Sequence, residues 1–230
     1  MQLKIINNNI MDKKTYIDRD TILLGSFSTR AGNNGCIYFN KYFDENKINA
    51  IYKSFSIQNI ENAIRAIKTL DIKGFAISMP FKTQVIKYLD EITPQVKEIN
   101  ACNTVINNNG RLKGYNTDWL AIKEYMNNYK KCTFMYILGD GGYSKAMQYV
   151  CKILKIEYEI ITRNNWNTIM NIRNSYIFNC TPVENIEENI NKDNIFIDCI
   201  VTTESGKKLS ELQANYQLEI YMREIFGIYL

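Results

Sequence analysis

The sequence YILGDGGYSKAM, residues 136–147, joins an apolar run to an amphipathic segment through three glycines. Gly139, Gly141 and Gly142 form the pattern G-x-G-G-x-x-x-A, which differs from the strict dinucleotide fingerprint G-x-G-x-x-G. Glycines permit a tight turn and let the N–H groups of a helix N-terminus approach a pyrophosphate closely. Glycines also end strands for purely structural reasons. At the first strand–helix turn of an alternating unit, however, this pattern favours a nucleotide site.

The next predicted strand, YEIITR, ends on Arg163, where NAD-binding proteins usually carry a carboxylate that holds the ribose hydroxyl. The planar guanidinium suits a 2′-phosphate because it can make two charge-assisted hydrogen bonds. The alternative is an exposed arginine without a ligand. The strand end therefore predicts NADP rather than NAD.

Strand and helix signals alternate on both sides of this turn, which predicts an α/β fold with parallel sheets in both halves. A hairpin with an Asn-Asn-Gly turn is expected between residues 105 and 115. A helix over 119–129 separates the two halves, and the helix over 208–226 is long enough to pack back onto the first half. The other expected strands are 21–27, 50–57, 74–79, 133–138, 158–163, 175–180 and 194–201, and the other expected helices are 59–70, 83–89, 94–100 and about 142–155.

Composition places the chain among ordinary globular proteins. Of its 230 residues 46% are hydrophobic and 23% charged, and the net charge of +4 is scattered rather than gathered into a nucleic-acid-binding arm. No apolar segment is long enough to span a bilayer. The first 14 residues lack a signal-peptide core, so we expect a cytoplasmic protein without nucleic-acid or membrane partners.

The chemistry open to the chain is restricted by its side chains. Its six cysteines are spaced singly without a C-x-x-C pair, so neither a disulfide framework nor a metal site is predicted. Histidine is absent, which excludes triads built on it. Proton transfer therefore depends on Lys, Asp, Glu, Tyr or Cys.

Two polar positions follow buried segments. The run GFAISMPFKTQ, residues 74–84, reads as a strand that stops at Pro80 just before Lys82, and GYNTDW brings Asp118 to the end of the first half. A lysine beside a carboxylate can act as a poised acid–base pair. The alternatives are a surface lysine and a helix N-cap at Asp118.

These motifs together resemble the shikimate dehydrogenase family. ISMPFK is similar to the V-T-x-P-F-K motif of the family, and ACNT and GYNTD are similar to its A-x-N-T and G-x-N-T-D motifs in the same order. GDGGYSKA, TRN and NCTP resemble its glycine loop, its NADP-reading segment and a strand end near the cofactor. LQANYQLEIY resembles its closing helix.

The resemblance implies a substrate-binding and catalytic domain over residues 1–118, joined by 206–230, and a Rossmann-like NADP domain over 119–205. It implies NADP-dependent interconversion of 3-dehydroshikimate and shikimate, with Lys82 and Asp118 handling the proton. The implied substrate-binding residues are Ser26, Ser28, Ser78, Asn103, Thr117 and Gln213. The implied cofactor-binding residues are Gly139, Gly141, Gly142, Tyr143, Thr162, Arg163, Asn164, Cys180 and Thr181.

Two departures from the family pattern qualify these expectations. GSFSTRAGNNG, residues 25–35, is closest to the shikimate dehydrogenase-like branch, and its Arg30 either pairs with a substrate carboxylate or faces solvent. After Asp198 the chain runs almost directly into its closing helix, with Val201 in place of a substrate-contacting tyrosine and Lys208-Leu209 in place of the end of a glycine–methionine motif. The alternatives are a dehydrogenase of quinate or an amino-shikimate, or a catalytically weak ligand-binding homologue. Either a monomer or a homodimer is compatible with the sequence.

Overall fold

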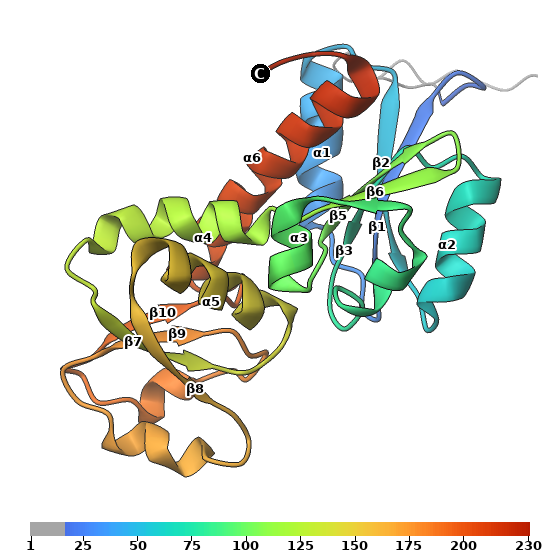
Figure 1. The fold of residues 1–230 in the computed structure, drawn as a ribbon. Helices are drawn as coiled ribbons and strands as arrows, with labels where there is room; N and C mark the ends of the chain where they lie inside the picture. The colour runs from blue at the N-terminus through green and yellow to red at the C-terminus, as the bar shows by residue number, and fades with distance from the viewer. Residues whose placement is uncertain (1–16) are drawn as a thin grey trace, which may run out of the picture.

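The computed structural model describes residues 17–230, which form two separate β-sheets (Figure 1). The first sheet has six strands in the order β2-β1-β3-β5-β6-β4, and the second has four in the order β10-β9-β7-β8. The strands of the first sheet are β1 (Ile22–Ser28), β2 (Ala50–Ser56), β3 (Gly74–Ile77), β4 (Glu91–Ile92), β5 (Thr104–Asn108) and β6 (Arg111–Tyr115). Those of the second are β7 (Phe134–Leu138), β8 (Glu157–Ile161), β9 (Tyr176–Asn179) and β10 (Ile195–Asp198). The predicted two-domain α/β fold is confirmed.

Strand direction differs between the two sheets. All pairs of the second sheet are parallel, as are β2 with β1 and β1 with β3. The prediction of a parallel first sheet is wrong for β3–β5, which is antiparallel, whereas β5 and β6 form the expected antiparallel hairpin. Asn109 and Gly110 join β5 to β6 with φ of 52° and 89°. Positive φ at both positions of a two-residue turn makes a tight hairpin, and a hairpin is necessarily antiparallel.

Helices cover both faces of each sheet. The first sheet packs on one side against α2 (Ile60–Thr69) and α3 (Pro94–Ile99), and on the other against α1 (Asn34–Glu45) and the second half of α6 (Glu204–Phe226). The second sheet packs against α4 (Asp118–Met126) and α5 (Gly142–Leu154) on one face and against short 3₁₀ turns on the other. These 3₁₀ turns are η3 (Trp166–Asn171) and η4 (Ile186–Asn189), and two more, η1 (Gln84–Tyr88) and η2 (Asn127–Tyr129), follow β3 and α4.

The helix α6 packs on both sheets, running from the second domain back to the first (Figure 1). It begins at Glu204, four residues before the predicted start at Lys208, because the Thr203 side chain accepts a hydrogen bond from the Gly206 N–H and caps it. Leu209 lies in the core of the second domain, whereas Tyr221 lies in the core of the first. The predicted return of the closing helix to the first domain is therefore confirmed.

Within residues 17–230 no helix combines the length and apolar character that a membrane span needs. The same residues hold no cluster of three or more His, Cys, Asp or Glu side chains able to bind a metal ion. The expectation of a cytoplasmic protein rests on the first 14 residues, and these lie outside the described residues.

Candidate active site

Lys82 and Asp118 form a buried ion pair between the two domains. Lys82 follows β3 and Asp118 is the first residue of α4, directly after β6. Lys82 Nζ donates to Asp118 Oδ2 at 2.7 Å, and the two side chains are only 15% and 2% exposed. A carboxylate this deeply buried is tolerated only with a charged or hydrogen-bonding partner. The two residues predicted to share a proton therefore lie in direct contact.

The other oxygen of Asp118 is held by Asn103. Asn103 Nδ2 donates to Asp118 Oδ1 at 2.9 Å and to Thr117 Oγ1 at 3.0 Å. Its Oδ1 accepts from the Thr117 N–H and the Thr104 hydroxyl, both at 2.8 Å. Asn103 and Thr117, predicted to bind substrate, are thus buried and bonded to one another, so Asn103 fixes the carboxylate of Asp118.

Two amides of α6 join this network from one face of the helix. Gln213 Nε2 donates to Thr117 Oγ1 at 3.3 Å. Gln217, which is buried, donates to the Asn103 carbonyl oxygen at 3.1 Å and to Thr104 Oγ1 at 2.8 Å. The sequence pointed to Gln213 only. The spacing of four residues, which puts two side chains on one helix face, is the signal that would have found Gln217.

A cleft of about 870 Å³ lies between β1, α1 and α6. It brings together Ser26, Ser28, Ser78 and Gln213, all predicted to bind substrate, and Arg30 and Val201 line it as well. Lys82 and Asp118 lie outside the lining, but Gln213 connects cleft and ion pair because it reaches Thr117.

Sequence reasoning missed two buried hydroxyls of β2. Ser54 accepts a hydrogen bond from Ser26 Oγ at 3.0 Å, and Tyr52 lines the same cleft. Burial raises the pKa of Tyr52 far above its ordinary value, so this phenol stays protonated. Both belong to one face of β2, in register with Leu24 and Ser26 of β1. The two-residue period of the strand could have suggested them.

The glycine turn connects β7 to α5. Gly139 has φ of +96°, and a Cβ there would lie 2.8 Å from Thr181 Cγ2, so this position requires glycine. A Cβ at Gly141 would meet only open space. Because Gly141 has no side chain to cap α5, the first N–H groups of that helix are free to bind an anion. The turn therefore fits a phosphate.

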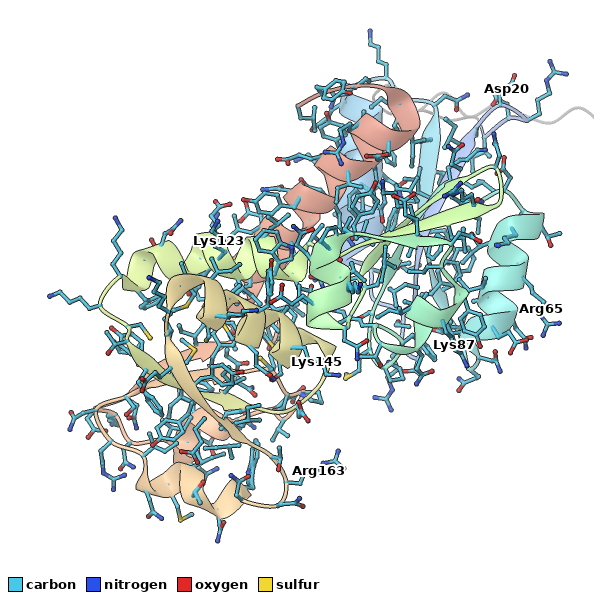
Figure 2. The ribbon with its side chains drawn as sticks, in the orientation of Figure 1. Asp20, Arg65, Lys87, Lys123, Lys145 and Arg163 are labelled. Atoms are coloured by element: carbon cyan, nitrogen blue, oxygen red, sulfur yellow. The ribbon has the colours of Figure 1, made fainter. Side chains whose placement is uncertain are left out.

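Arg163 follows β8 and is exposed, and Figure 2 shows its side chain extending into solvent. Its neighbour Thr162 is fixed by a hydrogen bond from the Thr162 N–H to Asn165 Oδ1 at 2.8 Å, whereas Asn164 is exposed. The guanidinium is accessible to a ligand at the carboxyl end of the sheet.

Tyr143 points from the first turn of α5 toward the ion pair. Its ring stacks on Phe178 of β9 with centroids 6.3 Å apart, and Lys82 Nζ lies 5.2 Å from its centroid. Burial, then the electrostatic influence of Cys199 and Asp118, raises the pKa of Tyr143 well above its ordinary range. Burial likewise raises the pKa of Cys199 to about 12. These groups are neutral at physiological pH.

Sequence comparison identifies the family. Residues 35–105 match the model of the shikimate dehydrogenase substrate binding domain. A shikimate dehydrogenase-like protein of Haemophilus influenzae is 41% identical over 133 residues, which cover 57% of this chain and 49% of that protein. A shikimate dehydrogenase (NADP(+)) of Clostridium botulinum is 30% identical over 207 residues, 76% of this chain and 80% of that protein.

The chain belongs to the shikimate dehydrogenase family.

The resemblance to the shikimate dehydrogenase-like branch is confirmed as well. The solved structure of a shikimate 5-dehydrogenase-like protein is 28% identical, with a TM-score of 0.76 over 90% of this chain and 94% of the other. The shikimate dehydrogenase of Aquifex aeolicus has the same fold, with a TM-score of 0.76 at 23% identity, over 94% of this chain and 96% of the other. The matches to the Haemophilus relative and to a Pyrococcus furiosus shikimate dehydrogenase (NADP(+)) span only 49% and 43% of those proteins. The chain thus matches about half the length of these relatives.

Proposed function

We propose that the protein is an NADP-dependent oxidoreductase that interconverts 3-dehydroshikimate and shikimate. The carrying observation is the buried Lys82–Asp118 pair, which lies between a cleft lined with hydroxyls and a glycine turn that fits a phosphate. In this proposal residues 1–118, with 206–230, bind the substrate, and residues 119–205 bind NADP. Relatives named shikimate dehydrogenase (NADP(+)) support the cofactor.

The proton chemistry follows from the ion pair. When bound, the nicotinamide supplies hydride transfer. In the oxidation direction the neutral Lys82 amine accepts the proton of the substrate hydroxyl and becomes the ammonium, and in the reverse direction the ammonium returns that proton. Asp118 stabilises the charged ammonium and holds its position at 2.7 Å. Asn103 keeps the carboxylate from rotating, since it binds the second oxygen. Alignment and proton transfer are thus the contributions of the protein.

Ligand contacts are assigned by position. Ser26 and Ser28 hold the substrate carboxylate, with Arg30 as an added cation at the rim of the same cleft. The remaining substrate contacts are assigned to Ser78 and Gln213, which line the cleft, and to Asn103 and Thr117, which are buried and reach a substrate only if they give up part of their bonding to one another. The pyrophosphate is assigned to the turn of Gly139, Gly141 and Gly142, and the 2′-phosphate to Thr162, Arg163 and Asn164. The nicotinamide end is assigned to the place that Tyr143, Cys180 and Thr181 surround, where the Tyr143 ring now packs on Phe178.

One observation favours a second candidate, a ligand-binding protein of low activity. Only five residues, 199–203, connect β10 to α6, and Val201 is 46% exposed at the cleft, where it offers no hydroxyl. A substrate polar group would lack a partner there, so activity would be low.

The test is to mix the protein with NADP and shikimate and to follow the appearance of NADPH. Turnover supports the first candidate. Calorimetric binding of shikimate without turnover supports the second, and turnover of quinate or an amino-shikimate alone would assign a different ring acid. The absence of binding to all of these ligands would contradict both candidates.

A further inference from the structure

The second sheet creates a crevice at one defined place. Its strand order, β8-β7-β9-β10, means that the chain moves from β7 outward to β8 and then crosses to β9 on the other side. In open parallel sheets, ligands bind outside the carboxyl ends of the strands at such a reversal. The glycine turn follows β7 and Cys180 follows β9, so they form the two sides of this crevice.

The ring of Tyr143 lies beside the carboxyl end of β9. It stacks on Phe178, the third residue of β9, at an interplanar angle of 23°. The ammonium of Lys82 lies 5.2 Å from the ring centroid, a distance at which a cation and an aromatic face attract. Cys199 and Asp118 both act on the pKa of the phenol, which places them nearby as well.

A bound nicotinamide must come close to Lys82. Hydride transfer needs the reacting carbons roughly 3–3.5 Å apart, and the substrate carbon carries the hydroxyl whose proton Lys82 takes. The nicotinamide ring of a cofactor bound to the second domain must therefore reach Lys82 from that domain. The main chain of the glycine turn already packs there, since a Cβ at Gly142 would lie 3.0 Å from Lys82 Cβ and 3.3 Å from Ala101 Cβ. Tyr143 lies beside this contact, against both Phe178 at the end of β9 and Lys82, and so stands on the path from the second domain to Lys82.

We infer that Tyr143 occupies the place of the nicotinamide ring, so that the two ends of NADP are bound unequally. This inference rests on the proposed function. The proposed phosphate contacts are the uncapped start of α5 and the exposed Arg163, and neither depends on the position of the Tyr143 ring. The nicotinamide is seated only after Tyr143 leaves Phe178 and Lys82. Tyr143 is therefore a residue that lowers affinity for the whole cofactor while leaving affinity for its adenosine end unchanged.

The test compares NADP⁺ with adenosine 2′,5′-bisphosphate, which carries the 2′-phosphate but no nicotinamide. Both are titrated by calorimetry into the protein, into Tyr143→Ala, and into Tyr143→Phe, which keeps the ring. Tyr143→Ala should bind NADP⁺ about tenfold more tightly, equal to about 1.4 kcal/mol. Its affinity for the bisphosphate should not change. Tyr143→Phe should match the unmodified protein with both ligands.

Each other result has a defined meaning. If Tyr143→Ala binds NADP⁺ equally or more weakly while the bisphosphate still binds, the ring is a wall of the cofactor site and the inference is wrong, although the proposed cofactor remains. If neither ligand binds any variant, the proposed NADP site fails and the inference with it. If Tyr143→Ala is unfolded by circular dichroism, Tyr143→Leu, which fills part of the space without a ring, is judged by the same two affinities.

Discussion

Lys82→Met separates the structural role of the ion pair from its chemical role. Methionine retains the apolar stem that packs against Gly142 but removes the ammonium. Asp118, 2% exposed, then keeps only the hydrogen bond from Asn103. Removing one partner of a buried ion pair costs about 3–5 kcal/mol, so the free energy of unfolding should fall by this amount. The double variant Lys82→Met with Asp118→Asn leaves no buried charge and should recover most of that loss.

Turnover should respond differently from stability. A general acid–base group contributes about 10²–10⁴-fold, and Lys82→Met should lose this factor in kcat while shikimate binding changes far less. Asp118→Asn should be similarly severe. Because the two groups act as one unit, the double variant should be scarcely slower than the poorer single variant, although it is more stable than Lys82→Met.

The measurements are urea unfolding and NADPH appearance on the same preparations. Near-normal turnover by a folded Lys82→Met would refute the assignment of Lys82 to proton transfer. A double variant as unstable as Lys82→Met would refute the claim that the unpaired carboxylate causes the loss.

Three further changes test other parts of the structure. Arg163→Ala removes a charge-assisted contact worth about 1.5–3 kcal/mol, so the preference for NADP over NAD should drop on the order of tenfold or more in calorimetric titrations, with NAD affinity unchanged. Gly206→Ala would put a Cβ 1.9 Å from the Ile200 carbonyl oxygen and should lower the free energy of unfolding by about 1–3 kcal/mol, whereas Gly32→Ala, with open space around it, should not. Burial raises the pKa of Asp198, so this carboxyl contributes stability below its unfolded-state pKa of about 3.9 that is lost as pH rises through the folded-state pKa. Asp198→Asn should therefore be more stable than the unmodified protein at neutral pH and should lose this advantage in acid. A Tm of Asp198→Asn below that of the unmodified protein at neutral pH would contradict the argument.

Local patterns predicted the secondary structure because each segment carries its own periodicity and end signals. The expected helix over 59–70 is α2, which buries Ile60, Ile64 and Ile67 on one face. The segment from Gly139 to Gly142 is the expected turn between strand and helix. Such features depend on residues a few positions apart, which a single sequence displays directly.

The contacts between segments that are distant in the sequence were harder to predict. Lys82 and Asp118 are 36 positions apart, and only family resemblance brought them together before the structure did so. The direction of the Tyr143 ring could not be predicted, because it depends on packing against Phe178 and Lys82, which lie far from it in the sequence. Tyr52 was overlooked because a tyrosine in a strand is normally explained as core.

The path of α6 has a consequence for the order in which the protein can mature on the ribosome. Leu218, Tyr221 and Met222 complete the apolar layer that covers Leu24 and Phe39, yet α6 begins 89 positions after β6 ends. At about 5–20 residues per second this interval lasts roughly 4–18 s. Throughout it, the part of this side that α6 covers stays open, although α1 is already present, and aromatic side chains such as Phe39 lack their partners. The nascent chain therefore passes through a stage at which part of an apolar layer is incomplete, which is the kind of surface that promotes aggregation. The first domain to be synthesised is not the first to be finished.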